Sequence, residues 1–150
     1  MAGNLIVYDK FKFLLGKKLV DLSVDAVNVV LLANGYTFDF THTAYADLTN
    51  EVANGHGYLT GGQALANQTW TESGRTSTFD ADDSRWDASG GTIGPFRKAA
   101  LVLQTTVASI VKPLLGCIVL DANDQNIGDG NFFVINWNAS GILTESGADS

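Results

Sequence analysis

Four aspartates lie within eight residues of the chain, where carboxylates could do chemistry: Asp80, Asp82, Asp83 and Asp87. Paired carboxylates can bind a hard cation or work as general acid and base. Adjacent aspartates at a strand end are also ordinary turn formers, because their side chains accept hydrogen bonds from nearby backbone amides. We favour the turn interpretation, since the sequence fixes no second carboxylate opposite them.

A second acidic segment, DANDQNIGDG, spans Asp121 to Gly130. Oxygen-bearing side chains alternate at its first, third and fifth positions, as they do in a calcium-binding loop. The motif then fails, because Asn126 stands where such a loop needs glycine and Phe132 stands where it needs its closing glutamate. We therefore expect a solvated hairpin loop, although Asp124 and Asp129 could hold a cation in another geometry.

Nucleophilic and zinc-binding residues are few. His42 and His56 are fourteen positions apart, without the i, i+4 spacing of a helical zinc site. Cys117 is the single cysteine and lies in the apolar run LLGCIVL, so we expect a small buried residue, not a nucleophile. A G-x-S-x-G motif is also absent. The sequence thus lacks catalytic signatures, and we expect no metal and no cofactor; a metal-dependent hydrolase that uses Asp80 to Asp87 or Asp121 to Asp129 is a weaker alternative.

Glycines and aromatic residues admit functional and structural interpretations. The glycine group contains G-x-G without a strand-to-helix context or a lysine, so turns explain it better than a phosphate site. Its members are Gly55, Gly57, Gly61 and Gly62. Most large aromatics are expected in the core, but an exposed one could stack on a sugar or anchor a protein interface. The candidates are Trp70, Trp86, Trp137, Tyr36, Tyr45 and Tyr58.

The elements that would position these residues are predicted to be strands. Three apolar runs favour buried strands: Ala26 to Ala33, Arg97 to Leu103 and Pro113 to Leu120. Alternation predicts strands in Asn131 to Trp137, Gln63 to Trp70 and Thr76 to Phe79, the last two joined by a turn at Glu72 to Arg75. A short helix within Leu5 to Leu15, stopped at Gly16, and one helical turn in Thr43 to Leu48 are also expected. The fold class is all-β, or β-rich with one or two short helices, arranged as a β-sandwich or jelly-roll-like fold.

Length and charge bound the remaining possibilities. A chain of 150 residues fits one domain. We expect an N-terminal arm or short helix at 1–18, a single β-sandwich domain at 19–144 and a polar tail at 145–150. The formal net charge of −7 argues against nucleic-acid binding. No window approaches the roughly 20 apolar residues that span a bilayer, and the N-terminus lacks a signal-peptide pattern, so we expect no membrane partner and synthesis in a cytoplasm.

Four ordered segments resemble a known family. They are VVLLANGYTFDFTHTAYADLTNEVANGHGYLTGGQALAN, FDADDSRWDASGGTIGPFRKAALVL, PLLGCIVLD and GNFFVINWNASGILT. Together they resemble small virion structural proteins of tailed bacteriophages, described as capsid decoration (cement) or head fibre proteins. The matching motifs are Leu31 to Tyr36, Tyr45 to Asp47, Glu51 to Tyr58, Gly61 to Leu65 and Trp137 to Leu143. The chain departs from the family at Gly94-Pro95-Phe96-Arg97, and its first eighteen residues are not covered.

The resemblance implies a non-enzymatic protein that binds the assembled major capsid protein lattice and stabilises the head. It implies a location on the capsid surface of the virion, after synthesis in the host cytoplasm. We expect the protein to associate with itself as a homotrimer or homodimer, since repeated copies on a lattice gain from multivalency. The alternative is a head fibre, neck or tail-associated module that binds a receptor or sugar.

The N-terminal arm is the predicted interface, because apolar residues at a chain end are unusual unless something covers them. Its residues are Leu5, Ile6, Val7, Tyr8, Phe11 and Phe13. An arm packed onto its own domain is the competing interpretation.

Overall fold

The computed structural model describes residues 4–146. This part of the chain holds fourteen strands, the helix α1 (Asp9–Gly16) and the 3₁₀ helix η1 (Tyr45–Asp47), which confirms the predicted β-rich fold. In chain order the strands are β1 (Ile6–Val7), β2 (Val27–Leu32), β3 (Gln63–Ala64), β4 (Thr69–Ser73), β5 (Thr76–Asp80), β6 (Ser84–Asp87), β7 (Ile93–Phe96), β8 (Lys98–Leu103), β9 (Thr106–Val107), β10 (Ile110–Val111), β11 (Leu114–Val119), β12 (Gln125–Ile127), β13 (Phe132–Ile135) and β14 (Leu143–Ser146).

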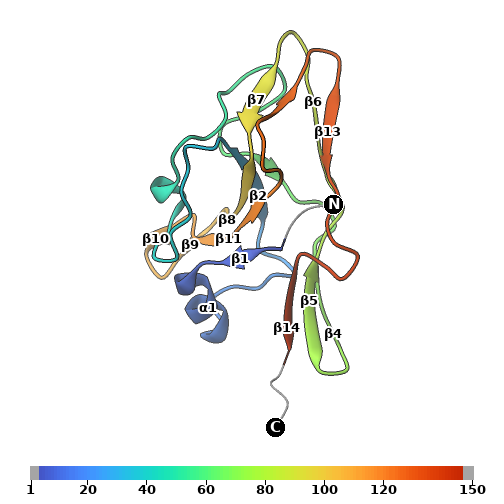
Figure 1. Ribbon diagram of the computed structural model, residues 1–150. Helices are drawn as coiled ribbons and strands as arrows, with labels where there is room; N and C mark the ends of the chain where they lie inside the picture. The colour runs from blue at the N-terminus through green and yellow to red at the C-terminus, as the bar shows by residue number, and fades with distance from the viewer. Residues whose placement is uncertain (1–3, 147–150) are drawn as a thin grey trace.

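A five-stranded antiparallel sheet in the order β1-β11-β8-β2-β3 forms the middle of the molecule (Figure 1). Strand β8 lies at its centre, as the unbroken apolar run from Arg97 to Leu103 predicts. Strands β2 and β8 pair without interruption from Val27 opposite Leu103 to Leu32 opposite Lys98. The long pairing between three apolar strands makes this sheet the rigid base on which the other elements pack.

Both faces of the central sheet are covered, which explains its continuous apolar strands. In β2, Val29 and Leu31 point into the main core, whereas Val30 and Leu32 point into a second, smaller cluster on the other face. Successive side chains of a strand alternate between faces, so a strand that is buried on both sides needs an apolar residue at every position. The second cluster is covered by the chain after β2, which contributes Tyr36 and Phe38.

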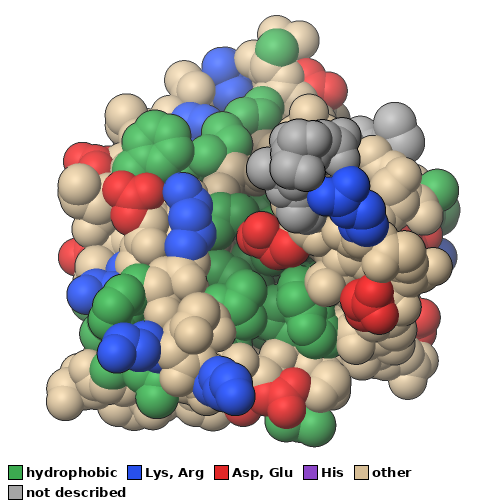
Figure 2. Space-filling view, turned by 90° about the horizontal axis from the view of Figure 1, so that it is seen from below, with side chains coloured by type: hydrophobic (Ala, Val, Ile, Leu, Met, Phe, Trp, Pro, Cys, Tyr) green, Lys and Arg blue, Asp and Glu red, His purple; other side chains and the backbone are tan. Residues whose placement is uncertain are grey.

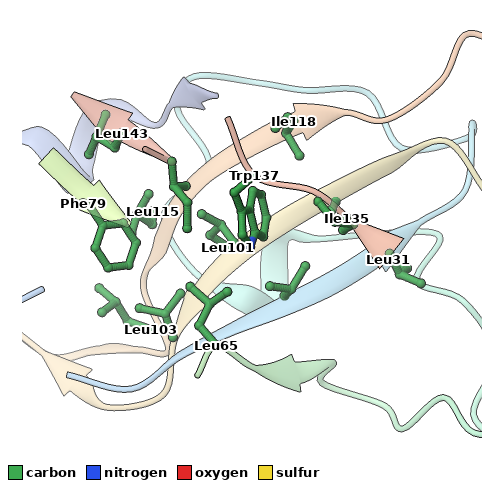
Figure 3. Close-up of a cluster of buried hydrophobic side chains, with 14 of the residues drawn as sticks. Leu31, Leu65, Phe79, Leu101, Leu103, Leu115, Ile118, Ile135, Trp137 and Leu143 are labelled. Carbon is green, nitrogen blue, oxygen red and sulfur yellow. The ribbon is translucent and has the colours of Figure 1, made fainter. Parts of the chain in front are cut away.

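The layer opposite the central sheet is divided into three small antiparallel sheets, β14-β5-β4, β13-β6 and β12-β7. The main core lies between the two layers. Figure 3 shows its side chains pointing toward one another from both sides, among them Leu101 and Leu115 of the central sheet and Phe79, Ile135 and Trp137 of the opposite layer. The fold is therefore sandwich-like, with a second layer that is broken into pieces. Within residues 4–146 no helix is long and apolar enough to cross a membrane.

The N-terminal segment is part of this fold. Strand β1 pairs with β11, with Ile6 opposite Cys117, so it forms one edge of the central sheet. The predicted helix is confirmed as α1, which ends at Gly16 and buries Phe11 and Leu14 in the main core. The segment thus supplies both a strand and core side chains of the domain, as in the competing interpretation of an arm packed onto its own domain.

Three predictions need correction. Residues 121–130 are not only a loop, because they contain β12. This strand pairs with β7 on either side of Gly94-Pro95, with Gln125 opposite Phe96 and Ile127 opposite Ile93. The predicted strand from Gln63 to Trp70 is two strands, β3 and β4, because the chain leaves the central sheet there and crosses to the opposite layer. The expected tail begins inside β14, and 147–150 lie outside the described residues.

Candidate functional site

The four clustered aspartates do not converge on a shared site. Each side chain accepts hydrogen bonds from a different neighbour, as turn-forming and strand-end carboxylates do. The pairs are Asp80 with the N–H of Ala81 (2.9 Å), Asp82 with the Asn67 amide (2.6 Å), Asp83 with the N–H of Trp137 (3.0 Å), and Asp87 with the Arg85 guanidinium (2.7 Å). Within residues 4–146 no group of three or more His, Cys, Asp or Glu side chains could hold a metal ion.

The carboxylates between Asp121 and Gly130 are likewise used one by one. Asp121 accepts a hydrogen bond from the N–H of Asn123 at 2.8 Å. Asp124 pairs with Arg97 at 2.7 Å, and Asp129 accepts a bond from the N–H of Gly90 at 2.9 Å. These contacts hold the segment against β7 and the β6–β7 connection. They do not form the oxygen cage that a calcium ion requires.

Cys117 lies buried in the second cluster, as predicted. Burial raises the pKa of its thiol to about 11, so the thiolate needed for nucleophilic attack does not form near neutral pH. Beside it runs a short chain of hydrogen-bonding groups, in which the Tyr8 hydroxyl contacts that of Tyr36 at 2.7 Å and Tyr36 contacts Nδ1 of His42 at 3.0 Å. His56 is exposed, in a different loop, and its carbonyl accepts a bond from Ser89.

One carboxylate gathers several donors, and sequence reasoning missed it. Oε1 of Glu51 accepts hydrogen bonds from the Tyr58 hydroxyl at 2.8 Å and from the N–H of Gly61 at 2.7 Å. Its Oε2 accepts the hydroxyl of Tyr45. The Tyr58 oxygen also accepts the N–H of Leu31 at 3.1 Å, which ties the assembly to β2. We use the name Glu51 hub for the Glu51 carboxylate together with the hydroxyls of Tyr45 and Tyr58 and the N–H groups of Gly61 and Leu31.

The Glu51 hub ties the chain between Tyr45 and Gly61 to strand β2. Burial raises the pKa of Tyr58, and the neighbouring Glu51 carboxylate raises it further, since a second negative charge there would be unfavourable. The same two causes raise the pKa of Tyr45 to about 12. Both hydroxyls therefore stay protonated as donors, and the chemistry of the hub is structural. The motif set could have pointed to the hub from the sequence, because Tyr45, Glu51, Tyr58 and Gly61 all lie in the motifs quoted above.

Most of the candidate aromatics are core residues, as expected. Tyr36, Tyr58, Trp86 and Trp137 are buried. Trp70 is half-buried and borders a cleft of about 400 Å³, whose other lining residues are Leu15, Lys18, Val20, Asp21 and Leu22. This cleft lies between α1 and β4 on the lower face of the molecule, where Figure 2 shows a hollow lined by hydrophobic side chains.

The residues predicted to form an interface divide into two groups. Tyr8 and Phe11 are fully buried, and Leu5 and Val7 pack partly buried against the main core, so these four side chains pack inside the chain itself. The pairing of β1 with β11 turns the side chains in and beside β1 inward, and α1 places Phe11 in the core. Ile6 and Phe13 remain exposed, with 40% and 54% of their surface accessible.

The exposed aromatics are phenylalanines, and two of them lie together. Phe13 of α1 and Phe40 line one shallow groove of about 350 Å³ with Asp9, Lys10, Thr41 and Thr43. Thr43 also borders a second groove of about 340 Å³, which includes Tyr45, Ile110, Val111 and Lys112. Sequence reasoning named Phe13 but missed Phe40 and Val111, because nothing in a single chain tells which apolar residues remain outside.

Comparisons of this chain with protein-family models, with curated proteins and with solved structures gave no match.

Proposed function

We propose that this chain is a structural protein of a tailed-phage virion that decorates the capsid. The carrying observation is that the residues of the ordered motif set are those that build the scaffold. Tyr45, Glu51, Tyr58 and Gly61 meet in the Glu51 hub, and Leu31 of the first motif lies in β2 beside it. A motif set that specifies a scaffold suits a family whose task is to present a rigid surface.

Decoration works through binding equilibria and needs no reactive group. A protein that binds the assembled lattice but not free subunits stabilises the assembly by mass action. Many copies on repeated sites raise the effective strength further if the copies also contact one another. The partners in this proposal are the major capsid protein and further copies of the chain itself, as a homotrimer or homodimer.

The physical properties of the chain support this use. Two apolar layers and a central sheet buried on both faces make a stiff body, so little conformational freedom is lost when it docks. The net charge of −7 would keep decorated particles apart in solution, because like-charged surfaces repel.

The test is co-sedimentation of the purified chain with phage heads that lack it, followed by counting bound copies per shell. Saturable binding in a ratio fixed by the lattice is the expected result. Absence of binding to heads of the phage that encodes the chain would overturn the proposal.

A neck, fibre or receptor-binding role is the second candidate, and the cleft beside Trp70 favours it. A half-buried indole next to Lys18 and Asp21 combines a stacking surface with charged groups that can hydrogen-bond a sugar. Electron microscopy of virions separates the candidates. Copies spread over the shell support decoration, and copies confined to the neck or fibre tips support the second role.

A further inference from the structure

We infer that the surface around Phe13 and Phe40 is the docking face of this protein, and that it binds an acidic protein surface bearing apolar anchor residues. The inference deepens the proposed function, because on a virion that surface would belong to the capsid lattice. The lysine–phenylalanine patch, as we call the face, has an apolar part made of Phe13, Phe40, Ile110 and Val111. Its basic part is Lys10, Lys17 and Lys112.

The patch is apolar enough to anchor a partner. Phe13, Phe40 and Val111 are 54%, 53% and 63% exposed, which is high for large apolar side chains outside an interface. The two grooves that these residues line meet at Thr43 and together offer about 350 and 340 Å³ of recess. Recesses of this kind accept single apolar side chains of a partner, and such anchors supply most binding energy in protein interfaces.

The patch is also held rigid before any partner arrives. The carbonyl of Phe40 accepts the N–H of Asp9, the first residue of α1, at 3.1 Å. The Phe40 ring stands edge-on to Phe38 at 4.9 Å between centroids, and Phe38 stacks on the buried Tyr8 at 4.7 Å. On the other side, Leu114 donates its N–H to the Thr43 carbonyl at 3.0 Å. A preorganised face loses little entropy on binding.

Charge decides which partner fits. Four of the nine Lys and Arg residues lie in or beside the patch, namely Lys10, Lys17, Lys112 and Lys12, which pairs with Asp9. Three of the 15 acidic residues in 4–146 lie there, namely Asp9, Asp39 and Asp47, so the face is slightly positive while the chain as a whole carries −7. In Figure 2 most Lys and Arg side chains lie on the left half of the lower face, the side on which Figure 1 shows α1. The exposed lysines beside the phenylalanines make this face more positive than the rest of the chain, and this favours an acidic partner.

Self-docking through the same patch is disfavoured by this charge. A two-fold contact would place each lysine near its symmetry mate, and like charges across an interface weaken association. A head-to-tail contact with the acidic remainder of a second copy is also disfavoured. Many carboxylates there already accept bonds within the chain, as those of Asp82, Asp87 and Asp124 do.

Polyanions other than proteins fit less well. Lys10 and Lys17 lie over the Phe13 ring at 5.4 and 5.8 Å, so their ammonium groups flank an apolar centre. An acidic protein surface with apolar anchors can pack against the Phe13 ring and pair its carboxylates with the lysine ammonium groups.

The first experiment measures binding of full-length variants to undecorated heads. Phe13→Ser with Phe40→Ser is expected to weaken binding at least about tenfold. Lys10→Glu with Lys17→Glu is expected to slow association and to flatten its dependence on salt. The control is Phe132→Ser, which removes an aromatic of similar exposure (56%) from outside the patch and should leave binding unchanged. Unchanged binding by the patch variants, with wild type bound, would overturn the inference and leave decoration standing.

A second experiment tests the patch without heads, so that failure of the proposed function stays distinguishable. The isotope-labelled chain is titrated with a short amphipathic peptide of Glu and Leu, with the same peptide carrying Lys in place of Glu, with phosphatidylserine vesicles and with duplex DNA. Amide shifts around Phe13, Phe40 and Val111 with the acidic peptide alone are expected. The inference would be overturned by shifts with vesicles or DNA instead, or by the absence of shifts with every probe. A change in oligomeric state on mutating the patch would overturn it as well.

Discussion

At the scale of single residues, the Glu51 carboxylate connects two tyrosine hydroxyls and a backbone amide in a partly buried position. It accepts three hydrogen bonds, from Tyr45, Tyr58 and the N–H of Gly61. Its neighbour Tyr58 is fully buried. If the Glu51 carboxylate were removed, water could not reach the Tyr58 hydroxyl to replace it as hydrogen-bond acceptor. Leaving a buried donor unsatisfied costs about 1–3 kcal/mol for each group.

We therefore predict that Glu51→Ala lowers the free energy of unfolding by about 2–4 kcal/mol, measured by urea denaturation. Glu51→Gln should fall between wild type and the alanine variant, because it keeps one acceptor oxygen. The matched control is Glu72→Ala on the exposed strand β4, which should change stability by less than about 0.5 kcal/mol. Equal effects at the two glutamates would contradict the hub.

At the scale of elements, α1 carries two phenylalanines with opposite roles. Phe11 is 1% exposed within the main core, whereas Phe13 is 54% exposed in the lysine–phenylalanine patch. Phe11→Ala should lower the free energy of unfolding by about 3–5 kcal/mol, because it leaves a cavity in the core. Phe13→Ala should change it by less than about 0.5 kcal/mol. Urea denaturation of both variants checks the pair, and similar losses would mean that α1 does not pack as described.

The junction between β2 and β3 depends on glycine at position 62. Gly62 has φ +80°, and a Cβ there would lie 2.0 Å from the carbonyl oxygen of Val29. Gly74, in the β4–β5 turn, has φ +63° but no heavy atom within 4 Å of its added Cβ. Gly62→Ala should thus destabilise by about 3 kcal/mol or more, from strain plus a backbone clash.

Gly74→Ala bears only the strain of a left-handed conformation, about 1 kcal/mol. Thermal unfolding of both variants separates the two contributions. A larger loss at Gly74 than at Gly62 would show that the close contact with β2 is not present.

How far the sequence predicts these elements depends on how completely each strand is buried and on how far along the chain its pairing partner lies. Strands β2, β8 and β11 were predictable because burial on both faces demands unbroken apolar runs. The hairpin of β4 and β5 was predictable because its turn is local and contains Ser73 and Gly74. Strand β12 was not, because its polar residues QNI carry no periodic signal, and it exists only through pairing with β7, about thirty positions away.

The same distinction applies to the sites. The buried state of Cys117 followed from its apolar neighbours. The Glu51 hub did not follow, because its donors are six to ten positions away and meet only when the loops fold. The inward turn of Tyr8 depends on β1 pairing with β11, more than a hundred positions along the chain, and no local pattern encodes it.

At the scale of the whole molecule, all four tyrosines have raised pKa values. Burial is the first cause for Tyr8, Tyr36, Tyr45 and Tyr58 alike. The pKa of Tyr45 rises to about 12, and the thiol of Cys117 rises from 9.0 to about 11. These groups lie between β1 and α1, in β11 and in the loops that cover both faces of the central sheet, so together they report on the integrity of the fold.

The sign of the resulting pH dependence follows from proton binding. A group whose pKa is higher in the folded state holds its proton there at pH values where the unfolded chain releases it. Its contribution to stability is complete below the unfolded pKa and is lost as pH rises through the folded value. Stability should therefore decline from about pH 9, where the unfolded thiol ionises, and fall steeply above pH 10, where unfolded tyrosines ionise.

The measurement is a tyrosinate absorbance titration run beside circular dichroism. The folded protein should show less tyrosinate at pH 10 than the chain in denaturant, which is half ionised there. At higher pH the tyrosines should ionise together with the loss of structure, because deprotonation of the buried hydroxyls and unfolding are one linked event. A tyrosine that ionises near pH 10 while the dichroism stays native would be solvent-accessible. That outcome would contradict the packing of Tyr58 in the Glu51 hub or of Tyr8 beneath the lysine–phenylalanine patch, and single Tyr→Phe variants would identify which.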